Sequence, residues 1–267
     1  MIHEKIAIEN ENSQPYAALY TYLLDASTEL RTQKRPMIVI CPGGGYGFTS
    51  DREAELVAMQ FLAKGYHAAV LRYSTEPARY PTAVLELGKT IKTIRGRAGE
   101  WKVDADKIII TGFSAGGHLA ANYCTVWEEE WMAAELAAES EELRPNALIL
   151  GYPVITSGPF AHEGSFRNLL GERYEDMKEE LSLENKVTSS VPRTFIWHTY
   201  EDEAVPVQNA LLFVDALVRN HIPVEFHLFE KGGHGLSLAN KLTEGADGRG
   251  IERSAEGWIE LVCNWLV

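Results

Sequence analysis

The sequence predicts an α/β protein with one doubly wound, mostly parallel sheet and a small helical cap. Short runs rich in Ile and Val alternate with segments whose apolar residues recur at helical spacing. The apolar runs are continuous rather than alternating, as expected for strands that are buried on both faces of a sheet. A chain of 267 residues can form one α/β domain, so we expect a single domain over residues 1–267.

The elements follow one another in a regular order. The first 35 residues are expected to add one or two antiparallel edge strands. Core strands are predicted over residues 36–42, 67–73, 107–113, 146–154, 193–199 and 224–230. Helices are predicted over residues 52–66, 82–103, 207–222 and 254–267. Gly65 closes the first of these helices, as glycine commonly does.

Two stretches do not fit the alternation. Residues 128–145 predict a helix with a solvated acidic face. Residues 156–192 are too long for a bare connection between two strands, and insertions of this kind usually form helices over a site. We therefore interpret residues 156–192 as a cap insertion.

Composition and charge exclude several partners. The chain has 25 basic and 38 acidic residues, and its net charge of −13 repels nucleic acid and anionic lipid. The N-terminus lacks a basic segment followed by an apolar stretch, and no run reaches the roughly 18 apolar residues of a membrane span. A cytoplasmic protein without a membrane partner is expected. The sequence does not indicate an oligomeric state.

The three cysteines, Cys41, Cys124 and Cys263, are an odd number and lie far apart. They form no CxxC motif and no Cys/His metal-ligand spacing, so buried reduced thiols are expected. No metal ion or other cofactor is predicted.

The motif Gly112-x-Ser114-x-Gly116 joins the apolar run "KIIIT" to the helical stretch "AGGHLAANY". A strand, a sharp turn and a helix are the context in which such a serine projects from a sheet, with room only for small neighbours two residues away. We interpret Ser114 as a nucleophile rather than as a residue that merely starts a helix.

A serine nucleophile needs a base. His234 lies in the glycine-flanked loop "KGGHGL" after the last predicted strand, where an imidazole can reach the turn. The other candidates lie within strands or helices and are interpreted as packed or surface residues; they are His118, His198, His221 and His227.

The base needs an acid that orients it. Asp202 follows the strand at 193–199 and precedes "AVP", which begins the next helix. Its neighbours Glu201 and Glu203 are the alternatives, and both are readily interpreted as solvated. Asp202 is favoured because one short, rigid carboxylate can be presented to His234.

Three glycines follow the strand at 36–42 in "CPGGGYGFTS". Consecutive glycines let backbone N–H groups converge on one point, which suits an oxyanion hole. We assign this role to Gly44, Gly45 and the N–H of Ala115. Neither GxGxxG nor GxxxxGK[ST] fits these residues, so a nucleotide site is disfavoured.

Together these motifs resemble the α/β-hydrolase superfamily, in particular its esterase/lipase and acetylxylan-esterase-like bacterial members. The resemblance rests on "CPGGGYGFTSDRE", "GFSAGGHLAA", "LILGYPVI", "TYEDEAVPVQNALLFVDAL" and "KGGHGLSLAN". The order Ser114, Asp202, His234 is the order of that fold. Where many relatives have a histidine before the glycines, this chain has Cys41-Pro42. "GFSAGG" also replaces the "GDSAGG" of hormone-sensitive-lipase-like esterases.

The resemblance implies a metal-independent serine carboxylic-ester hydrolase for small acyl groups such as acetyl, sometimes on sugars, with a small-molecule ester as its partner. Tyr46, Phe48 and the insertion at 156–192 are candidates for the acyl or alcohol pocket, and the two aromatic side chains would be equally ordinary as core filler. An amide-cleaving hydrolase with the same triad, such as a peptidase or formamidase, is the first alternative. A non-catalytic binding module of the same fold is the second.

Overall fold

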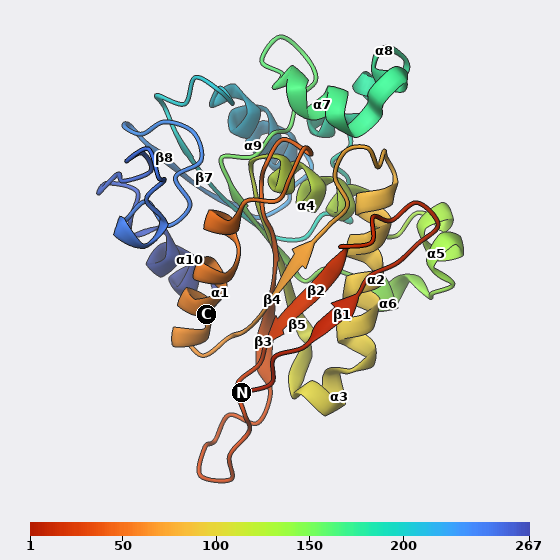
Figure 1. Ribbon diagram of the computed structural model, residues 1–267, viewed down its shortest axis with the longest axis vertical. Coiled ribbons are helices and arrows are strands. Elements are labelled where there is room, and N and C mark those ends of the chain that lie inside the picture. The colour runs from red at the N-terminus through yellow and green to blue at the C-terminus, as the bar shows by residue number, and fades with distance from the viewer.

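One eight-stranded sheet forms the centre of the computed structural model, which describes residues 1–267 (Figure 1). The strand order is β1-β2-β4-β3-β5-β6-β7-β8. The pairs β1/β2 and β2/β4 are antiparallel, and the other pairs are parallel. The strands are β1 (Lys5–Ala7), β2 (Ala18–Tyr22), β3 (Arg35–Cys41), β4 (His67–Arg72), β5 (Val103–Phe113), β6 (Ala147–Gly151), β7 (Thr194–Thr199) and β8 (Val224–Phe229).

Helices connect the strands and cover both faces of the sheet (Figure 1). They are α1 (Glu55–Ala63), α2 (Thr82–Gly96), α3 (Ala98–Trp101), α4 (Ser114–Val126), α5 (Glu130–Leu136), α6 (Ser140–Leu143), α7 (Glu163–Leu170), α8 (Tyr174–Met177), α9 (Gln208–Arg219) and α10 (Trp258–Leu266). Short 3-10 turns are η1 (Asp51–Glu53), η2 (Gly171–Arg173), η3 (Lys178–Leu181), η4 (Leu183–Asn185) and η5 (Lys241–Thr243). None of these helices combines the length and the apolar composition that crossing a membrane requires.

The sheet separates two apolar cores. In β3, Met37 and Val39 belong to the larger core with buried residues of α2, α4 and α9. Ile38 and Ile40 belong to the other core, with residues of α1 and α10. Successive side chains of a strand point to opposite faces. Because helices cover both faces, consecutive residues of β3 from Met37 to Cys41 are apolar and buried, which confirms the prediction from the continuous runs.

All six predicted core strands are present, and β1 and β2 are the expected edge strands. The single helix predicted over residues 82–103 is wrong, because it divides at Arg97 into α2 and α3. Lys102 then takes a left-handed φ of 56°, which ends α3 and turns the chain into β5.

The helix predicted over residues 128–145 also divides, into α5 and α6. Ala137 takes a left-handed φ of 44° at the break. The Lys92 ammonium of α2 donates to the carbonyl oxygens of Leu136 at 2.9 Å and of Ala137 at 2.7 Å. These bonds satisfy carbonyl groups that end a helix without partners, which explains why α5 stops there.

Candidate active site

Ser114 lies at the junction of β5 and α4 with a backbone φ of 52°. Such a left-handed conformation costs a residue with a Cβ atom roughly 1–3 kcal/mol. A Cβ atom on Gly112 would lie 2.2 Å from the Gly116 oxygen, and one on Gly116 would lie 2.1 Å from the Cys41 oxygen. The turn therefore requires glycine at both positions, and these contacts hold Ser114 at the carboxyl end of the sheet.

The structure brings Ser114, His234 and Asp202 into one chain of hydrogen bonds. Ser114 Oγ lies 2.8 Å from His234 Nε2, and His234 Nδ1 lies 2.7 Å from Asp202 Oδ2. When Nδ1 carries the proton and donates to Asp202, Nε2 is free to accept from the Ser114 hydroxyl. The Ser114 side chain is thus placed beside a base, and that base is oriented by a carboxylate.

Asp202 is buried, and each of its carboxylate oxygens is engaged. Oδ1 accepts from the N–H groups of Ala204 at 3.1 Å and Val205 at 2.9 Å. Oδ2 lies 3.4 Å from His198 Nε2 in addition to its bond with His234. Burial alone raises the pKa of Asp202, but the hydrogen bonds from His198 and His234 outweigh it and hold the pKa well below its usual value. The carboxylate therefore stays ionised at neutral pH.

The alternatives considered for the base and the acid lie elsewhere. Glu201 and Glu203 are exposed, and Glu201 accepts from the N–H of Gly232. His227 lies 2.8 Å from Glu225 on its own strand, and His221 is exposed. His198 is buried, as expected for a packed histidine. Its contact with Asp202 was not predicted. No spacing in the sequence signals that contact.

Gly44 and Gly45 lie beside Ser114 and His234 and line the same cavity. Their φ values are 128° and 63°, a region that favours glycine. Neither N–H group donates to an acceptor of the protein, in contrast to Gly43, whose N–H donates to Glu53 Oε2 at 2.7 Å. The N–H of Ala115 belongs to the first turn of α4, where helical N–H groups have no intrahelical partner.

Comparison with known proteins decides the family. The BD-FAE family model matches residues 24–217, more than half of the chain. The chain belongs to the BD-FAE family. Carboxylesterase Cest-2923 from Lactobacillus plantarum is 32% identical, with a TM-score of 0.86 over 100% of this chain and 97% of its own. The acetyl ester-xyloside bifunctional hydrolase from Caldicellulosiruptor lactoaceticus is 34% identical, with a TM-score of 0.81 over 98% of this chain and 94% of its own.

A longer relative is endo-1,4-beta-xylanase B of Butyrivibrio fibrisolvens, which is 37% identical over 246 residues. The match covers 87% of this chain but only 38% of that relative, so the chain spans well under half of its length. The comparisons confirm the predicted α/β-hydrolase fold and the resemblance to esterases. This BD-FAE family member is therefore a hydrolase of the carboxylesterase type.

The glycine loop of this BD-FAE family member is held by a buried carboxylate that sequence reasoning missed. Glu53 of η1 accepts the Gly43 N–H through Oε2 and the Tyr152 hydroxyl through Oε1 at 2.6 Å. Tyr152 also accepts the N–H of Ser237 at 2.8 Å, and its ring lies 5.2 Å from the His234 ring. Glu53 and Tyr152 thereby connect the glycine loop to the loop that carries His234.

Cys41-Pro42 directly precedes the three glycines of the glycine loop. Cys41 is buried, and burial raises the pKa of its thiol. The Tyr73 hydroxyl donates to the Pro42 carbonyl at 2.7 Å. Tyr73 and Glu53 therefore fix the two ends of the Pro42-Gly43 segment without a histidine.

The cleft around Ser114 has a volume of about 490 Å³, and two of the 14 residues that line it are hydrophobic. Phe48, one of the two predicted pocket residues, lines it and is 64% exposed. Arg52 and His162 also line the cleft. Burial and then the charge of His234 lower the pKa of His162, which favours its neutral form.

Tyr46, the other predicted pocket residue, does not line the cleft. Its side chain is buried, and its hydroxyl lies 2.9 Å from His118 Nδ1. His118 Nε2 in turn donates to the Leu181 carbonyl at 3.0 Å. The left-handed φ of Tyr46, 58°, directs the chain so that the ring packs under the loop. Tyr46 is therefore a structural support of the glycine loop.

Residues 156–192 form α7, α8 and three 3-10 turns. In Figure 1, α7 and α8 lie together at one end of the molecule. His162 precedes α7 and faces the cleft, and the Asn168 side chain donates to the Gly45 carbonyl at 2.9 Å. The insertion thus touches the cleft around Ser114 and the glycine loop.

Proposed function

We propose that this BD-FAE family member hydrolyses short-acyl esters, acetyl esters of sugars among them, through a covalent acyl-enzyme. The observation that carries the proposal is the chain of hydrogen bonds from Ser114 through His234 to Asp202, with distances of 2.8 and 2.7 Å. A serine hydroxyl is a weak nucleophile at neutral pH. A base that removes its proton during attack supplies the missing reactivity.

The reaction proceeds in two halves. Ser114 Oγ attacks the ester carbonyl while His234 takes its proton. The oxyanion then accepts hydrogen bonds from the N–H groups of Gly44, Gly45 and Ala115, each worth about 3 kcal/mol in comparable sites. His234 gives the proton to the leaving alcohol. A water molecule, deprotonated by His234, then attacks the acyl-enzyme. His234 returns that proton to Ser114 Oγ as the acyl–oxygen bond breaks and the acid leaves, and Asp202 stabilises the imidazolium in both halves.

The lining of the cleft supports a small acyl group and a polar alcohol. Phe48 and Ala204 are its only hydrophobic side chains, whereas Ser50, Arg52 and His162 offer hydrogen-bonding groups. Long acyl chains need apolar surface to bury. The similarity to a xylanase and to an acetyl ester-xyloside hydrolase adds support for an acetylated saccharide.

The test compares p-nitrophenyl acetate, butyrate and octanoate, with wild-type protein beside Ser114→Ala. We expect turnover of acetate and butyrate, little of octanoate, and a loss in kcat of at least about 10⁴-fold in the variant. Thermal unfolding of both proteins shows whether the variant is folded. Equal inertness of two folded proteins would overturn the ester proposal, and faster cleavage of a matched acetanilide would favour an amide hydrolase instead.

A further inference from the structure

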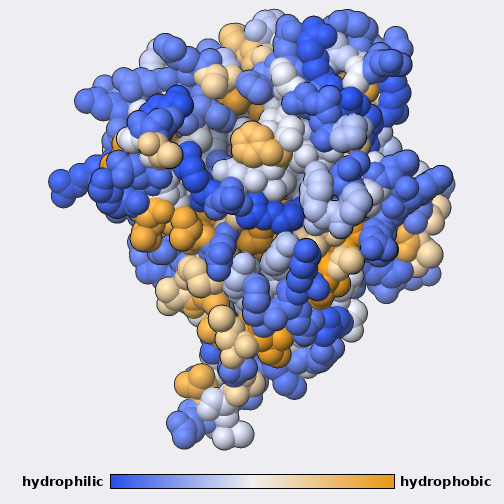
Figure 2. All heavy atoms as spheres, viewed as in Figure 1, coloured by the Kyte–Doolittle hydropathy of each residue, from blue (hydrophilic) through white to orange (hydrophobic).

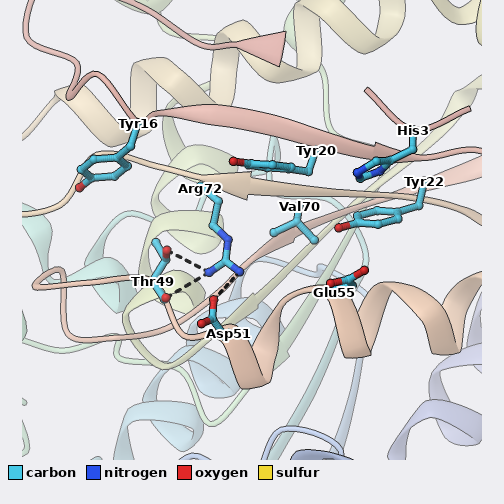
Figure 3. Close-up of a pocket in the computed structure, with 9 residues that line it drawn as sticks. All are labelled: His3, Tyr16, Tyr20, Tyr22, Thr49, Asp51, Glu55, Val70 and Arg72. Atoms are coloured by element: carbon cyan, nitrogen blue, oxygen red, sulfur yellow. Dashed lines mark hydrogen bonds and ion pairs between the residues drawn. The ribbon is translucent and has the colours of Figure 1, made fainter. Parts of the chain in front are cut away.

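A second cavity lies behind the segment that borders the catalytic cleft. It has a volume of about 510 Å³ and opens between β2, β4 and the start of α1 (Figure 3). Phe48, Ser50 and Arg52 line the catalytic cleft, whereas Thr49 and Asp51, between them in sequence, line this second cavity. The two cavities therefore share one wall.

The floor of the second cavity is aromatic. Tyr20 and Tyr22 are two residues apart on β2, so both side chains point to the same face of the sheet. Val70 of β4 lies directly opposite Tyr20 in the register. Helix α1 packs on β3 and β4 and leaves this part of β2 without a covering helix. We call this cavity the tyrosine groove.

One end of the tyrosine groove is held rigidly. Tyr16 is 45% exposed, but its hydroxyl accepts the N–H of Thr75 at 3.0 Å and lies 2.9 Å from the Thr75 hydroxyl. In Figure 3, Tyr16 lies at one end of the groove, Tyr20 in the middle, and Tyr22 beside His3 at the other end. Tyr16 is exposed, Tyr20 is half-buried and Tyr22 is buried, so Tyr16 and Tyr20 offer a ligand flat apolar ring surfaces without a large loss of side-chain entropy.

The wall of the groove that faces these rings is polar and carries negative charge. Arg72 is fully engaged, since it donates to the Thr49 carbonyl and hydroxyl at 3.1 Å and to Asp51 Oδ1 at 2.7 Å (Figure 3). Glu55 is exposed and accepts no hydrogen bond. Arg72 is neutralised by Asp51. The remaining charges at the groove are the Glu55 carboxylate and the Lys5 ammonium, whose Nζ lies 5.5 Å from the centroid of the Tyr20 ring. The groove itself therefore has no excess positive charge, and the net charge of −13 over the whole chain disfavours an anionic ligand.

We propose that the tyrosine groove binds a neutral saccharide chain. The C–H faces of pyranose rings pack on the apolar faces of aromatic side chains, while their hydroxyl groups donate to carboxylates such as those of Glu55 and Asp51. Tyr20 is the central contact. The choice of a saccharide over other neutral ligands rests on the proposed function, because a groove that shares a wall with the catalytic cleft then holds part of the same kind of molecule.

The face of the molecule shown in Figure 2 argues against a second copy of the chain as the occupant. This face is mostly hydrophilic, and its hydrophobic residues lie in separate small patches. Stable interfaces between copies need larger continuous apolar areas. A groove of about 510 Å³ lies instead within the roughly 300–1,000 Å³ range of small-ligand sites.

The test is direct binding of xylohexaose without acetyl groups, measured by calorimetry on wild-type protein, Tyr20→Ala, Tyr20→Phe and Tyr200→Ala. Tyr200 is 68% exposed and lines neither cavity, so its variant is the matched control. We expect Tyr20→Ala to weaken binding at least tenfold, and Tyr20→Phe and Tyr200→Ala to change it less than twofold. Turnover of p-nitrophenyl acetate stays within twofold in all three variants.

Absence of xylohexaose binding, or equal binding by wild type and Tyr20→Ala, would overturn the proposal. A dimer in sedimentation that dissociates in Tyr20→Ala would also overturn it in favour of a second copy. Failure of the groove is distinguishable from failure of the proposed function. Ester hydrolysis without saccharide binding rejects the groove alone, and saccharide binding by a protein that hydrolyses no ester rejects the proposed function alone.

Discussion

The turn that carries Ser114 and the glycine loop face the same cleft, but different forces hold them. Gly112 and Gly116 contact backbone atoms at distances that admit no Cβ atom. The glycine loop is instead held by side chains from distant segments, namely Glu53, Tyr73 and Tyr152. Steric fit fixes Ser114, the proposed nucleophile, whereas buried hydrogen bonds fix the proposed oxyanion donors.

This difference predicts how each region fails. A side chain that clashes with backbone atoms cannot be accommodated by a side-chain rotation, because the backbone itself would have to move. Changes at the turn should therefore affect folding. Removal of a buried hydrogen-bond partner costs less and leaves the chain folded, so changes behind the glycine loop should affect catalysis more than folding. The variants below separate the two cases.

Gly116→Ala is expected to have the largest effect. Alanine normally stabilises a helical position by about 1 kcal/mol relative to glycine, but here its Cβ would lie 2.1 Å from the Cys41 carbonyl oxygen. We expect the free energy of unfolding in urea to fall by more than about 3 kcal/mol. Gly99→Ala is the control, since Gly99 lies in α3 with no heavy atom near its added Cβ. A Gly116→Ala protein as stable as wild type would contradict the steric explanation of the turn.

Glu53→Ala is expected to reduce catalysis. Gly43 and Tyr152 lose their acceptor, so the adjacent Gly44 and Gly45 donors are less well positioned. We expect kcat for p-nitrophenyl acetate to fall about 100-fold, the scale for loss of one oxyanion donor, with little change in KM. Glu53→Gln keeps one acceptor oxygen and should recover most of the loss. A rise in KM at constant kcat would show that Glu53 acts on substrate binding instead.

His118 supports the glycine loop through Tyr46. Of the changes considered, replacement of His118 should have the smallest effect at neutral pH, and its effect on the free energy of unfolding should depend on pH. Burial lowers the pKa of His118 to about 4, while an unfolded chain has a histidine pKa of about 6.5. The unfolded state therefore binds a proton that the folded state excludes. This contribution to stability is fully present above pH 6.5 and is lost as the pH falls toward 4.

Urea unfolding between pH 4 and 7 measures this effect. One such proton gives a slope of up to about 1.4 kcal/mol per pH unit. We expect a smaller slope in His118→Gln, though not a flat line, because burial also lowers the pKa of His67. An unchanged slope in a folded His118→Gln protein would show that His118 does not carry the effect.

The features that could be predicted from the sequence are those that, like the turn at Ser114, depend on residues close together in the chain or on the order of the strands. Continuous apolar runs identified the strands, and the spacing around Ser114 identified the turn, because both depend on residues close together in the chain. His234 and Asp202 could be placed because each follows a strand at the same edge of a parallel sheet. These features need only local pattern and topology.

The missed features depend on contacts between distant segments. A glutamate at the start of a helix is usually solvated, so nothing in the sequence distinguishes Glu53 as buried. The sequence left open whether Tyr46 lines the pocket or fills the core, because its neighbours in sequence line the cleft while its own backbone turns the ring inward. The breaks in the helices at Arg97 and Ala137 depend on backbone geometry and on carbonyl partners such as the Lys92 ammonium.

The central claim is that Ser114 is a nucleophile activated by His234. Diethyl p-nitrophenyl phosphate tests it, because an activated serine oxygen bonds to phosphorus and expels p-nitrophenolate. Mass spectrometry of the digested protein should find one diethylphosphoryl group, on Ser114, and labelling of His234→Ala should be at least about 1,000-fold slower. A label on another residue, or equally fast labelling of His234→Ala, would contradict the claim.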